Sequence, residues 1–412
     1  MNKMSRVVVT GLGIISPIGS SVSEYWDSLK SGKCGIGMIT RFDTSDHKAK
    51  IAAEVKDFKP LEYMDKGDVR KRDLYTQYGI AAATQAVENS GIMGNVDEYK
   101  FGVYFGSGIG GIQTFSDEVN KLTAKGAKRV SPFFIPMIIG NICAGEIAIK
   151  FQAKASCLAM VTACATSNNT IGEAFRAIKH GYLDAAIAGG SEAAITPVGV
   201  AGFSNMMALS TNETPVEACC PFDKRRNGFI MGEGAGCLVL ENYDHAVARG
   251  ATIYGEIVGY GSTCDAHHIT APDPEGNGGA ASMKMAMEEA GLNGSENIYV
   301  NAHGTSTPLN DKSETLVIKR ALGEENAKKS IVSSTKSMTG HMLGAAGAAE
   351  AIACIMALKE GIIPPTIGFK EADENCDLDY CFNSAQEREI DFALSNGLGF
   401  GGHNACLALK KI

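Results

Sequence analysis

The sequence has no pair of cysteines separated by two residues, the spacing most typical of structural zinc sites. Its 12 cysteines lie singly along the chain, apart from the adjacent Cys219 and Cys220. This scatter is typical of free thiols in a reduced cytosolic interior. We therefore predict no metal centre.

Excess positive charge is also lacking, because 38 lysines and arginines face 46 acidic residues, for a net charge of -8. This balance argues against broad nucleic-acid binding, although a local basic patch can still dock an acidic partner. No apolar run is long enough to cross a bilayer, since the stretch 345–358 is interrupted by Glu350. The start MNKMSRVVVTGLG has no signal-peptide pattern. We expect a cytoplasmic protein with neither nucleic acid nor membrane as a partner.

What the sequence does have is material for a large core, with 412 residues of which 45% are hydrophobic. Short β-branched runs alternate with Ala-rich helical stretches along the whole chain. The expected elements are strand 7–9, helix 23–30, helix 75–90, strand 101–105, strand 253–260, helix 278–290, strand 298–302 and helix 344–359. This alternation predicts an α/β protein.

The alternation restarts near Gly250, so we predict an N-terminal half, 1–250, and a C-terminal half, 251–412. In each half a small-residue turn leads into an Ala/Gly-rich helix, once after Cys164 and again after His341. The parallel suggests a duplication. No low-complexity linker separates the halves, so we expect them to pack as one body with the chemistry between them.

One cysteine stands at a distinctive junction, VTACATSNNTIGEAFRAIKHG. A β-type run is expected to end at Thr162 and Ala163, and a helix to open just after Cys164. Unpaired amides at a helix N-terminus stabilise a thiolate, so we expect a lowered pKa for the Cys164 thiol and a nucleophilic role. A buried, inert thiol is the alternative that this context leaves open.

Two histidines lie in loops that follow expected strands. In YVNAHGTSTPLND, His303 ends a strand and Asp311 opens the next helix, which places the imidazole at the cleft of an α/β sheet. In SSTKSMTGHMLGAAGAAEA, Lys336 and His341 occupy a turn before a helix of small residues, which allows close approach. For either histidine alone, a hydrogen-bonded structural role is the simpler interpretation.

The C-terminal segment SNGLGFGGHNACLAL surrounds Phe400 with glycines, and exposed amides in such a loop can form an oxyanion hole. This segment and GSGIGG at 106–111 both contain the GxGxxG pattern of dinucleotide-binding proteins. The first precedes a strand rather than a helix, and the second lacks an acidic ribose partner about twenty residues on. Both are weak evidence for a nucleotide site.

Together, VTACATS, NAHGTSTPLND, STKSMTGHMLGAAG and NGLGFGGHN closely resemble the bacterial β-ketoacyl-acyl-carrier-protein synthases of the second type. RVVVTGLGIISPIG and PFDKRRNGFIMGEGAG are similar to the same family, so the resemblance covers nearly the whole chain. It implies a thiolase-like fold, a layered αβαβα duplication, and a homodimer. It also implies an acyltransferase that condenses an acyl thioester with malonyl-acyl carrier protein in fatty acid biosynthesis, releasing carbon dioxide and extending the chain by two carbons.

The resemblance also implies a role for each matched residue. Cys164 corresponds to the acyl-accepting nucleophile, and His303 and His341 to the pair that handles malonyl decarboxylation. Lys336 corresponds to an electrostatic support of the site. Further matches are Asp311 and Glu350, which organise this network; Thr305 and Thr307, which contact the pantetheine arm; Phe400, a mobile gate; and Ile109, in the wall of the acyl pocket. The Cys164 and Phe400 amides would form the oxyanion hole, and the chemistry requires no cofactor beyond the phosphopantetheine of the carrier.

Two residues separate this resemblance from related classes. His341 favours the elongating enzymes, because initiating synthases of the third type carry asparagine there, and Cys164 argues against chain-length factors, which lack the nucleophile. A degradative thiolase would show a second cysteine where GFGGHN stands, and a cysteine hydrolase explains one histidine only. A non-catalytic dimeric scaffold requires an inert Cys164. Fatty acid and polyketide pathways both stay open.

A basic rim is predicted to dock the acyl carrier protein, because KLTAKGAKR has four cations and no acid. The predicted docking residues are Lys66, Arg70, Lys71, Lys128 and Arg129. The sequence departs from many relatives at Cys219 and Cys220, where they show a small residue and arginine, and SNMMALS lacks a basic residue often found nearby. The apolar run Met137, Ile138 and Ile139 is expected near the subunit interface and the acyl pocket.

Overall fold

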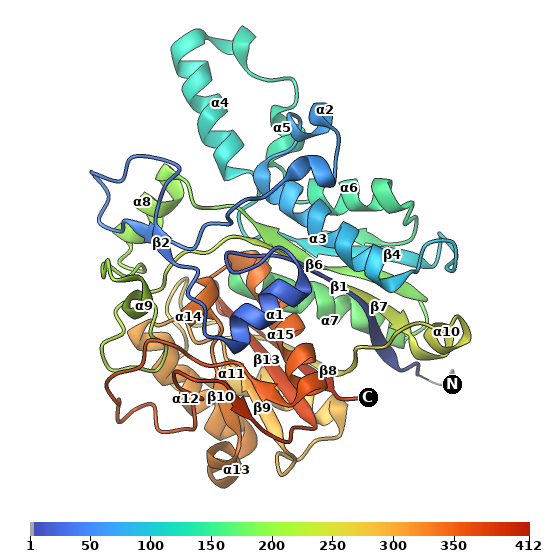
Figure 1. Ribbon diagram of the computed structural model, residues 1–412, viewed down its shortest axis with the longest axis vertical. Coiled ribbons are helices and arrows are strands. Elements are labelled where there is room, and N and C mark those ends of the chain that lie inside the picture. Colours follow the sequence, from blue (N-terminus) through green and yellow to red (C-terminus); the bar gives the residue numbers. More distant parts are fainter. Residues whose placement is uncertain (1–3) are drawn as a thin grey trace.

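The computed structural model describes residues 4–412, and its centre is a mixed sheet of ten strands (Figure 1). In spatial order the strands are β10 (Ile331–Ser333), β9 (Ile298–Asn301), β13 (Phe392–Gly399), β14 (His403–Lys410), β8 (Gly255–Cys264), β1 (Val7–Ile15), β7 (Gly234–Asn242), β6 (Ala185–Glu192), β4 (Phe101–Gly106) and β5 (Cys157–Leu158). The outer strands pair in parallel, and the pairs from β13 through β6 are antiparallel. Every residue of β1 and β6 is buried, as expected where helices cover both faces of a sheet.

The sheet consists of two halves with one topology. Within the first half the strands in chain order are β1, β4, β5, β6 and β7, and within the second they are β8, β9, β10, β13 and β14. From the outer edge inward, both halves run third, second, fourth, fifth, first. The halves join where β1 pairs with β8. This repeated order confirms the expected duplication, and the expected boundary at residue 250 falls between β7 and β8.

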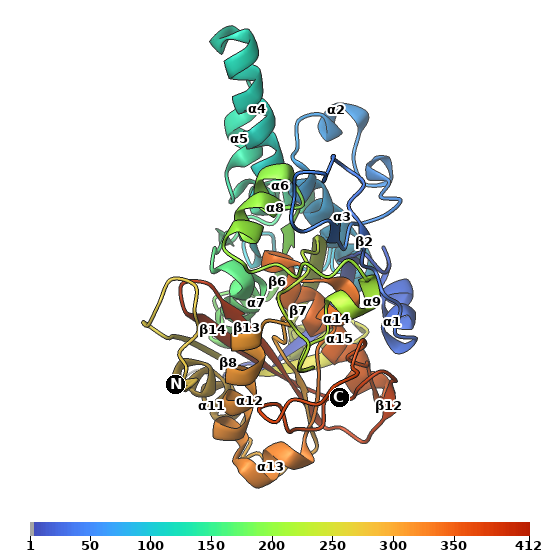
Figure 2. The same cartoon turned by 90° about the vertical axis from the view of Figure 1, so that its left-hand side faces the viewer.

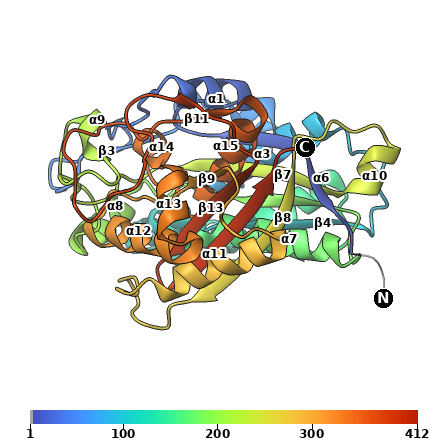
Figure 3. The same ribbon diagram turned by 90° about the horizontal axis from the view of Figure 1, so that it is seen from below.

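Helices form three layers around the two halves of the sheet (Figures 1 and 3). The middle layer holds α7 (Thr166–Lys179), which packs on β4 and β6, and α15 (Ala346–Glu360), which packs on α7, β7 and β13. The sequence of α15, AGAAEAIACIMALKE, is small or apolar on every side, as required of a helix that is buried all round. The outer layers are α3 (Leu74–Ser90) over β1 and β7, and α11 (Asn277–Ala290) with α12 (Pro308–Leu322) over the other half.

The apolar core follows these layers. Its largest cluster surrounds α7 and α15, and two more lie under α3 and under α11 with α12. Each strand and helix expected from the alternation is present, although several ends differ by a few residues. Within residues 4–412, no helix has the length and apolar character needed to cross a membrane.

Further elements lie around these layers. Helices α4 (Ile112–Lys125) and α5 (Phe134–Ile138) project beyond the sheet, as Figures 1 and 2 show. The remaining elements are α1 (Val22–Lys30), β2 (Gly37–Met38), β3 (Ile51–Ala52), η1 (Pro60–Glu62), α2 (Lys66–Val69), η2 (Ala127–Arg129), α6 (Ile142–Phe151), η3 (Ala163–Ala165), α8 (Pro197–Asn205), α9 (Pro215–Ala218), α10 (Tyr243–Ala248), α13 (Glu324–Lys329), α14 (Lys336–Thr339), η4 (Leu343–Ala345), β11 (Ile362–Ile363) and β12 (Gln386–Glu387).

Candidate active site

Cys164 lies in the short helical turn η3, directly before α7. The expected β-run to Thr162 and Ala163 is wrong, because β5 ends at Leu158 and Ala163 adopts a positive φ of 50°. The Thr166 hydroxyl fixes this turn, since it donates to the Ala163 carbonyl at 2.7 Å and accepts the Thr162 N–H at 3.0 Å. The cysteine therefore reaches the helix N-terminus through a strained turn rather than from a strand.

His303 follows β9 and is oriented by a carboxylate that the sequence did not indicate. Glu314, in α12, accepts the N–H of His303 at 2.6 Å and that of Gly304 at 2.7 Å. Burial raises the pKa of Glu314 to about 7. Asp311, expected to organise the Lys336–histidine network, accepts the backbone N–H of Phe222 at 2.8 Å, whereas Glu314 makes the direct contacts with the His303 loop.

His341 follows α14 and is held by backbone contacts. Its N–H donates to the Ile230 carbonyl at 2.7 Å, and its Nδ1 accepts the Leu343 N–H at 3.3 Å. The neutral imidazole therefore carries its proton on Nε2, which is buried without a hydrogen-bond partner among residues 4–412. In the same turn Lys336 forms an ion pair with Glu350, and both side chains are almost completely buried.

The fold brings Cys164, His303 and His341 together. Their sulfur and ring nitrogens lie within 4.8 Å of one another, and the two ring centroids are 5.2 Å apart at 85°. Burial and the nearby Lys336 ammonium lower the pKa of both histidines well below the ordinary value, so both imidazoles are neutral.

The environment of Cys164 contradicts the expected lowering of its pKa. Burial raises the pKa of the thiol to about 12, although the Lys336 ammonium and the Phe400 N–H oppose this rise. The local helix signal was correct in position, but removal from water outweighs it. The resting group is a thiol, and a proton acceptor must take part when it attacks.

A cavity of about 560 Å³ opens onto the three side chains. Ile109, Thr305, Thr307 and Phe400, all named from the sequence, line it. The Thr305 and Thr307 hydroxyl oxygens are 3.0 Å apart. Sequence reasoning missed other lining residues, which are mostly apolar: Phe203, Met206, Met207, Phe229, Leu343 and Leu398. The cavity combines an apolar wall with polar groups beside Cys164, an arrangement suited to a ligand with a long apolar part and one polar end.

Gly399 allows the end of β13 to touch the turn that carries Cys164. A Cβ atom at this position would lie 2.7 Å from the Thr162 carbonyl oxygen and 3.1 Å from the Cys164 nitrogen. Only glycine permits this approach, which places the neighbouring Phe400 beside the nucleophile.

Comparison with known proteins identifies the family. Residues 4–246 match the N-terminal domain of beta-ketoacyl synthase, and residues 254–370 match its C-terminal domain. The chain belongs to the beta-ketoacyl synthase family. It is 49% identical over 408 residues to 3-oxoacyl-[acyl-carrier-protein] synthase 2 of Synechocystis, covering 98% of each chain. It is 50% identical over 412 residues to the protein of the same name from Staphylococcus aureus strain COL, covering 100% of this chain and 99% of that one.

Solved structures agree with this assignment. A ketosynthase bound to a hexaketide and to its type II polyketide acyl-carrier protein superposes with a TM-score of 0.92 at 32% identity, covering 99% of this chain and 100% of that one. The thiolase-like fold and the membership in an acyltransferase family of condensing enzymes, both inferred from the motifs, are confirmed.

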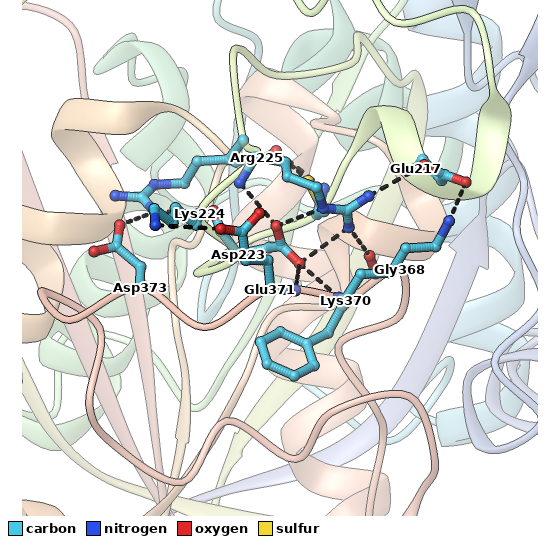
Figure 4. Close-up of polar contacts among 12 residues, drawn as sticks. Glu217, Asp223, Lys224, Arg225, Gly368, Lys370, Glu371 and Asp373 are labelled. Carbon is cyan, nitrogen blue, oxygen red and sulfur yellow. Dashed lines mark hydrogen bonds and ion pairs between the residues drawn. The ribbon is translucent and has the colours of Figure 1, made fainter.

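Figure 4 shows the polar contacts made by the motif PFDKRRNG. The Asp223 carboxylate accepts the N–H groups of Lys370, at 2.6 Å, and Glu371, at 2.9 Å, and it pairs with Arg225. Arg226 donates to Asp373 at 2.6 Å and to the Thr307 carbonyl at 3.3 Å. The motif thereby ties the segment after Gly368 to the loop that carries the cavity threonines.

Two departures from the family pattern lie directly before this motif. Cys219 and Cys220 are 1% and 2% exposed, and the Cys219 thiol donates to the Lys336 carbonyl at 3.2 Å. They are packing residues of the catalytic turns, so these positions do not form part of an exposed docking surface.

The five predicted docking residues lie outside the cavity. Lys66 begins the short helix α2, Arg70 and Lys71 follow its end, and Lys128 and Arg129 end η2; all five side chains are exposed. The Lys71 ammonium lies 5.5 Å from the centroid of the Phe133 ring, which brings the segment after α2 close to the start of α5. Figure 1 shows α2 beside the projecting α4 and α5.

Proposed function

We propose that this chain is an elongating β-ketoacyl-acyl-carrier-protein synthase of fatty acid biosynthesis. It would hold an acyl group on Cys164 and condense it with malonyl-acyl carrier protein, releasing carbon dioxide and extending the chain by two carbons. The observation that carries this proposal is the meeting of one thiol and two neutral imidazoles at an apolar cavity of about 560 Å³. The names of the curated relatives support the same reaction.

The first step transfers the acyl group from its carrier to Cys164. The sulfur attacks the thioester carbon, the carrier thiol leaves, and the nearly isoenergetic exchange preserves the thioester. The Cys164 proton needs an acceptor, and His303 is suited to this role because one of its ring nitrogens lies within 4.8 Å of the Cys164 sulfur and its Nδ1 has no hydrogen-bond partner among the described residues. His341 is less suited, because the Leu343 N–H occupies its Nδ1. Proton transfer accompanies the attack, since the pKa of the thiol is raised and that of the imidazole lowered.

Malonyl decarboxylation then provides the carbon nucleophile. The bond to the carboxylate breaks, carbon dioxide leaves, and its electron pair forms an enolate whose charge falls on the thioester oxygen. The Nε2–H of His341 and the His303 ring are available as neutral donors to this oxygen. Because carbon dioxide loss creates the carbanion directly, the step requires neither a strong base nor a metal.

Condensation completes the reaction. The enolate carbon attacks the acyl carbon on Cys164, and the resulting oxyanion can be stabilised by the Cys164 and Phe400 amides. Each such donor lowers the activation free energy by about 3 kcal/mol in comparable sites. Collapse re-forms the carbonyl and breaks the carbon–sulfur bond, so the β-ketoacyl product leaves on the carrier, and the released Cys164 thiolate takes up one proton from the medium to restore the resting thiol.

The proposed partners are the acyl carrier protein and a second copy of this chain, in the cytoplasm. One related ketosynthase structure contains its acyl-carrier protein, and the basic rim on α2 and η2 offers complementary charge to an acidic carrier. The short edge strand β5 leaves Leu158 52% exposed, and Val161 beyond it is 59% exposed. An unpaired edge with apolar residues is suited to self-association. A monomer in light scattering at micromolar concentration, with full condensing activity, would reject the dimer.

Variants of the three residues separate the steps. Cys164→Ala should abolish formation of the acyl-enzyme. Intact-protein mass spectrometry with an acyl-carrier donor measures this step. His303→Ala should slow acylation roughly a hundredfold, whereas His341→Ala should leave it within severalfold. In both histidine variants the rate of decarboxylation should fall roughly a hundredfold. Carbon dioxide release from the malonyl carrier measures this rate. Normal decarboxylation in both variants would reject the proposed chemistry, and equal acylation in both would reject the assignment of the proton acceptor.

A further inference from the structure

A buried carboxylate beside the site has no role in the steps above. Glu192 ends β6, and its side chain is 0% exposed. No lysine, arginine or histidine of residues 4–412 forms an ion pair with it. An unpaired buried charge costs several kcal/mol unless hydrogen bonds compensate for the lost water. The hydrogen bonds that compensate for the lost water can also fix the backbone around the carboxylate.

Four donors converge on this carboxylate. Its Oε1 accepts the Ser107 hydroxyl at 2.8 Å and the Ile109 N–H at 3.1 Å. Its Oε2 accepts the Gly108 N–H at 2.8 Å and the Gly344 N–H at 3.0 Å. Three donors belong to the turn after β4, and the fourth belongs to η4. One side chain thereby joins two segments that are distant in sequence.

Both segments form the wall of the active-site cavity. Gly108 and Ile109 line it on one side, and His341 and Leu343 line it just before Gly344. The join is tight, because a Cβ atom at Gly344 would lie 2.4 Å from the Gly108 nitrogen. A displacement of one segment must therefore move the other.

The donor set requires a carboxylate rather than an amide. All four partners of Glu192 are N–H or O–H groups, and each oxygen accepts two of them. A glutamine of nearly equal volume offers one oxygen, so its NH2 group faces two donors whichever way it is turned. Glu192→Gln is consequently a specific probe of this arrangement.

We infer that Glu192 is a positioning residue that fixes the acyl-chain wall at Ile109 relative to the turn that carries His341. The inference rests on the proposed function and deepens it. Glu192 would support both the wall at Ile109, against which a long acyl chain presses, and the His341 imidazole, which stabilises the enolate. Loss of that support should alter chain-length preference and decarboxylation together.

The test compares Glu192→Gln with wild type for acyl transfer to Cys164 from acetyl and hexadecanoyl carrier donors. We expect hexadecanoyl transfer to fall roughly tenfold relative to acetyl transfer, and kcat for decarboxylation to fall roughly tenfold with an unchanged KM for the malonyl carrier. Ser107→Ala removes one donor without a change of charge, and it should show the same pattern at a few-fold size. It keeps the test decisive if Glu192→Gln does not fold.

Glu241→Gln is the matched control, because Glu241 is equally buried but pairs with Arg249 far from the cavity. It should lower the melting temperature without a change in chain-length profile. A wild-type profile in Glu192→Gln, or in Ser107→Ala where the first variant is unfolded, overturns the inference. The same altered profile in Glu241→Gln overturns it as well. Failure of the wild-type protein to condense at all would instead reject the proposed function.

Discussion

Replacement of Lys336 by methionine should leave the Glu350 carboxylate charged and unpaired in the core. The two side chains form an ion pair in which they are 1% and 4% exposed. Removal of one partner from such a pair costs about 3–5 kcal/mol, because the desolvation penalty of the other is no longer offset. With an unfolding entropy of about 2.1 cal/mol/K per residue over 412 residues, the melting temperature should fall roughly 3–6 °C.

The loss should depend on pH in a defined direction. Burial raises the pKa of Glu350, and the Lys336 charge opposes that rise, so the pKa should climb further in Lys336→Met. A carboxyl with a raised folded-state pKa is protonated in the folded protein at low pH, and its contribution to stability is lost as pH rises through that pKa. We expect a small loss of melting temperature near pH 5 and the full loss at pH 8.

Thermal unfolding of three variants checks the reasoning. The double variant Lys336→Met with Glu350→Leu should recover most of the lost stability, because it removes both charges. The surface pair of Lys30 and Glu360 is the control, and Lys30→Met should cost at most about 1 kcal/mol. A double variant as unstable as Lys336→Met, or a loss that does not change with pH, would refute the unpaired charge as the cause.

The same variant should change the pH dependence of catalysis. The Lys336 ammonium contributes to the lowered pKa of both His303 and His341. Without it the pKa of each imidazole should rise toward the ordinary value, although burial still lowers it. The acid limb of the decarboxylation rate should therefore move to higher pH in Lys336→Met. An unmoved acid limb would show that the charge does not reach the imidazoles.

Three further predictions concern single positions. The rate at which iodoacetamide alkylates Cys164 should keep rising from pH 7 to pH 10, because burial raises the pKa of the thiol to about 12. A plateau of this rate near pH 8 would show that the helix N-terminus affects the thiol pKa more than burial does. Gly399→Ala should slow acylation roughly tenfold in a folded protein, because its Cβ would press on the Thr162 carbonyl; unchanged acylation kinetics would refute the close approach. Reversal of charge at Lys128 and Arg129 should raise the carrier-protein KM and weaken its salt dependence, whereas unchanged kinetics would place docking elsewhere.

The α/β class was predictable because its signals are local, whereas Cys164, His303 and His341 were singled out through the family resemblance that their motifs carry. Alternating β-branched and Ala-rich segments are periodic over short windows, and Cys164, His303 and His341 each sit within a motif. The duplication, visible as two similar turns before small-residue helices, predicted that the two halves share one topology, but the order of the strands came from the structure. The alternation and the motifs need no knowledge of distant contacts.

The supporting carboxylates were not predictable in the same way. Asp311 and Glu314 are three residues apart on α12, and only the rotation of that helix decides which one meets the His303 amide. Glu192 accepts donors from turns more than eighty residues before it and about 150 residues after it. Because backbone amides are chemically alike at every position, the sequence around a buried carboxylate does not reveal which of them it will bind.

The direction of the Cys164 pKa depends on the same distinction. A helix N-terminus is visible in sequence and favours the thiolate, whereas burial arises from segments that close over the turn, including Gly399 and Phe400. The second effect is larger in this site. A local electrostatic argument placed Cys164 correctly at the helix N-terminus and gave the wrong direction for the change in its pKa.

In the proposed reaction, the buried Lys336 would allow the site to stabilise an enolate without also stabilising the malonyl carboxylate that must leave. A protonated imidazole would bind that carboxylate in the ground state, and binding substrate as tightly as transition state does not accelerate the reaction. Burial and the Lys336 ammonium keep His303 and His341 neutral, so they can donate N–H groups to the oxygen where charge develops. Glu350 in turn balances the ammonium. The ion pair of Lys336 and Glu350 thus places a positive charge near the imidazoles, while the net charge of the pair remains close to zero.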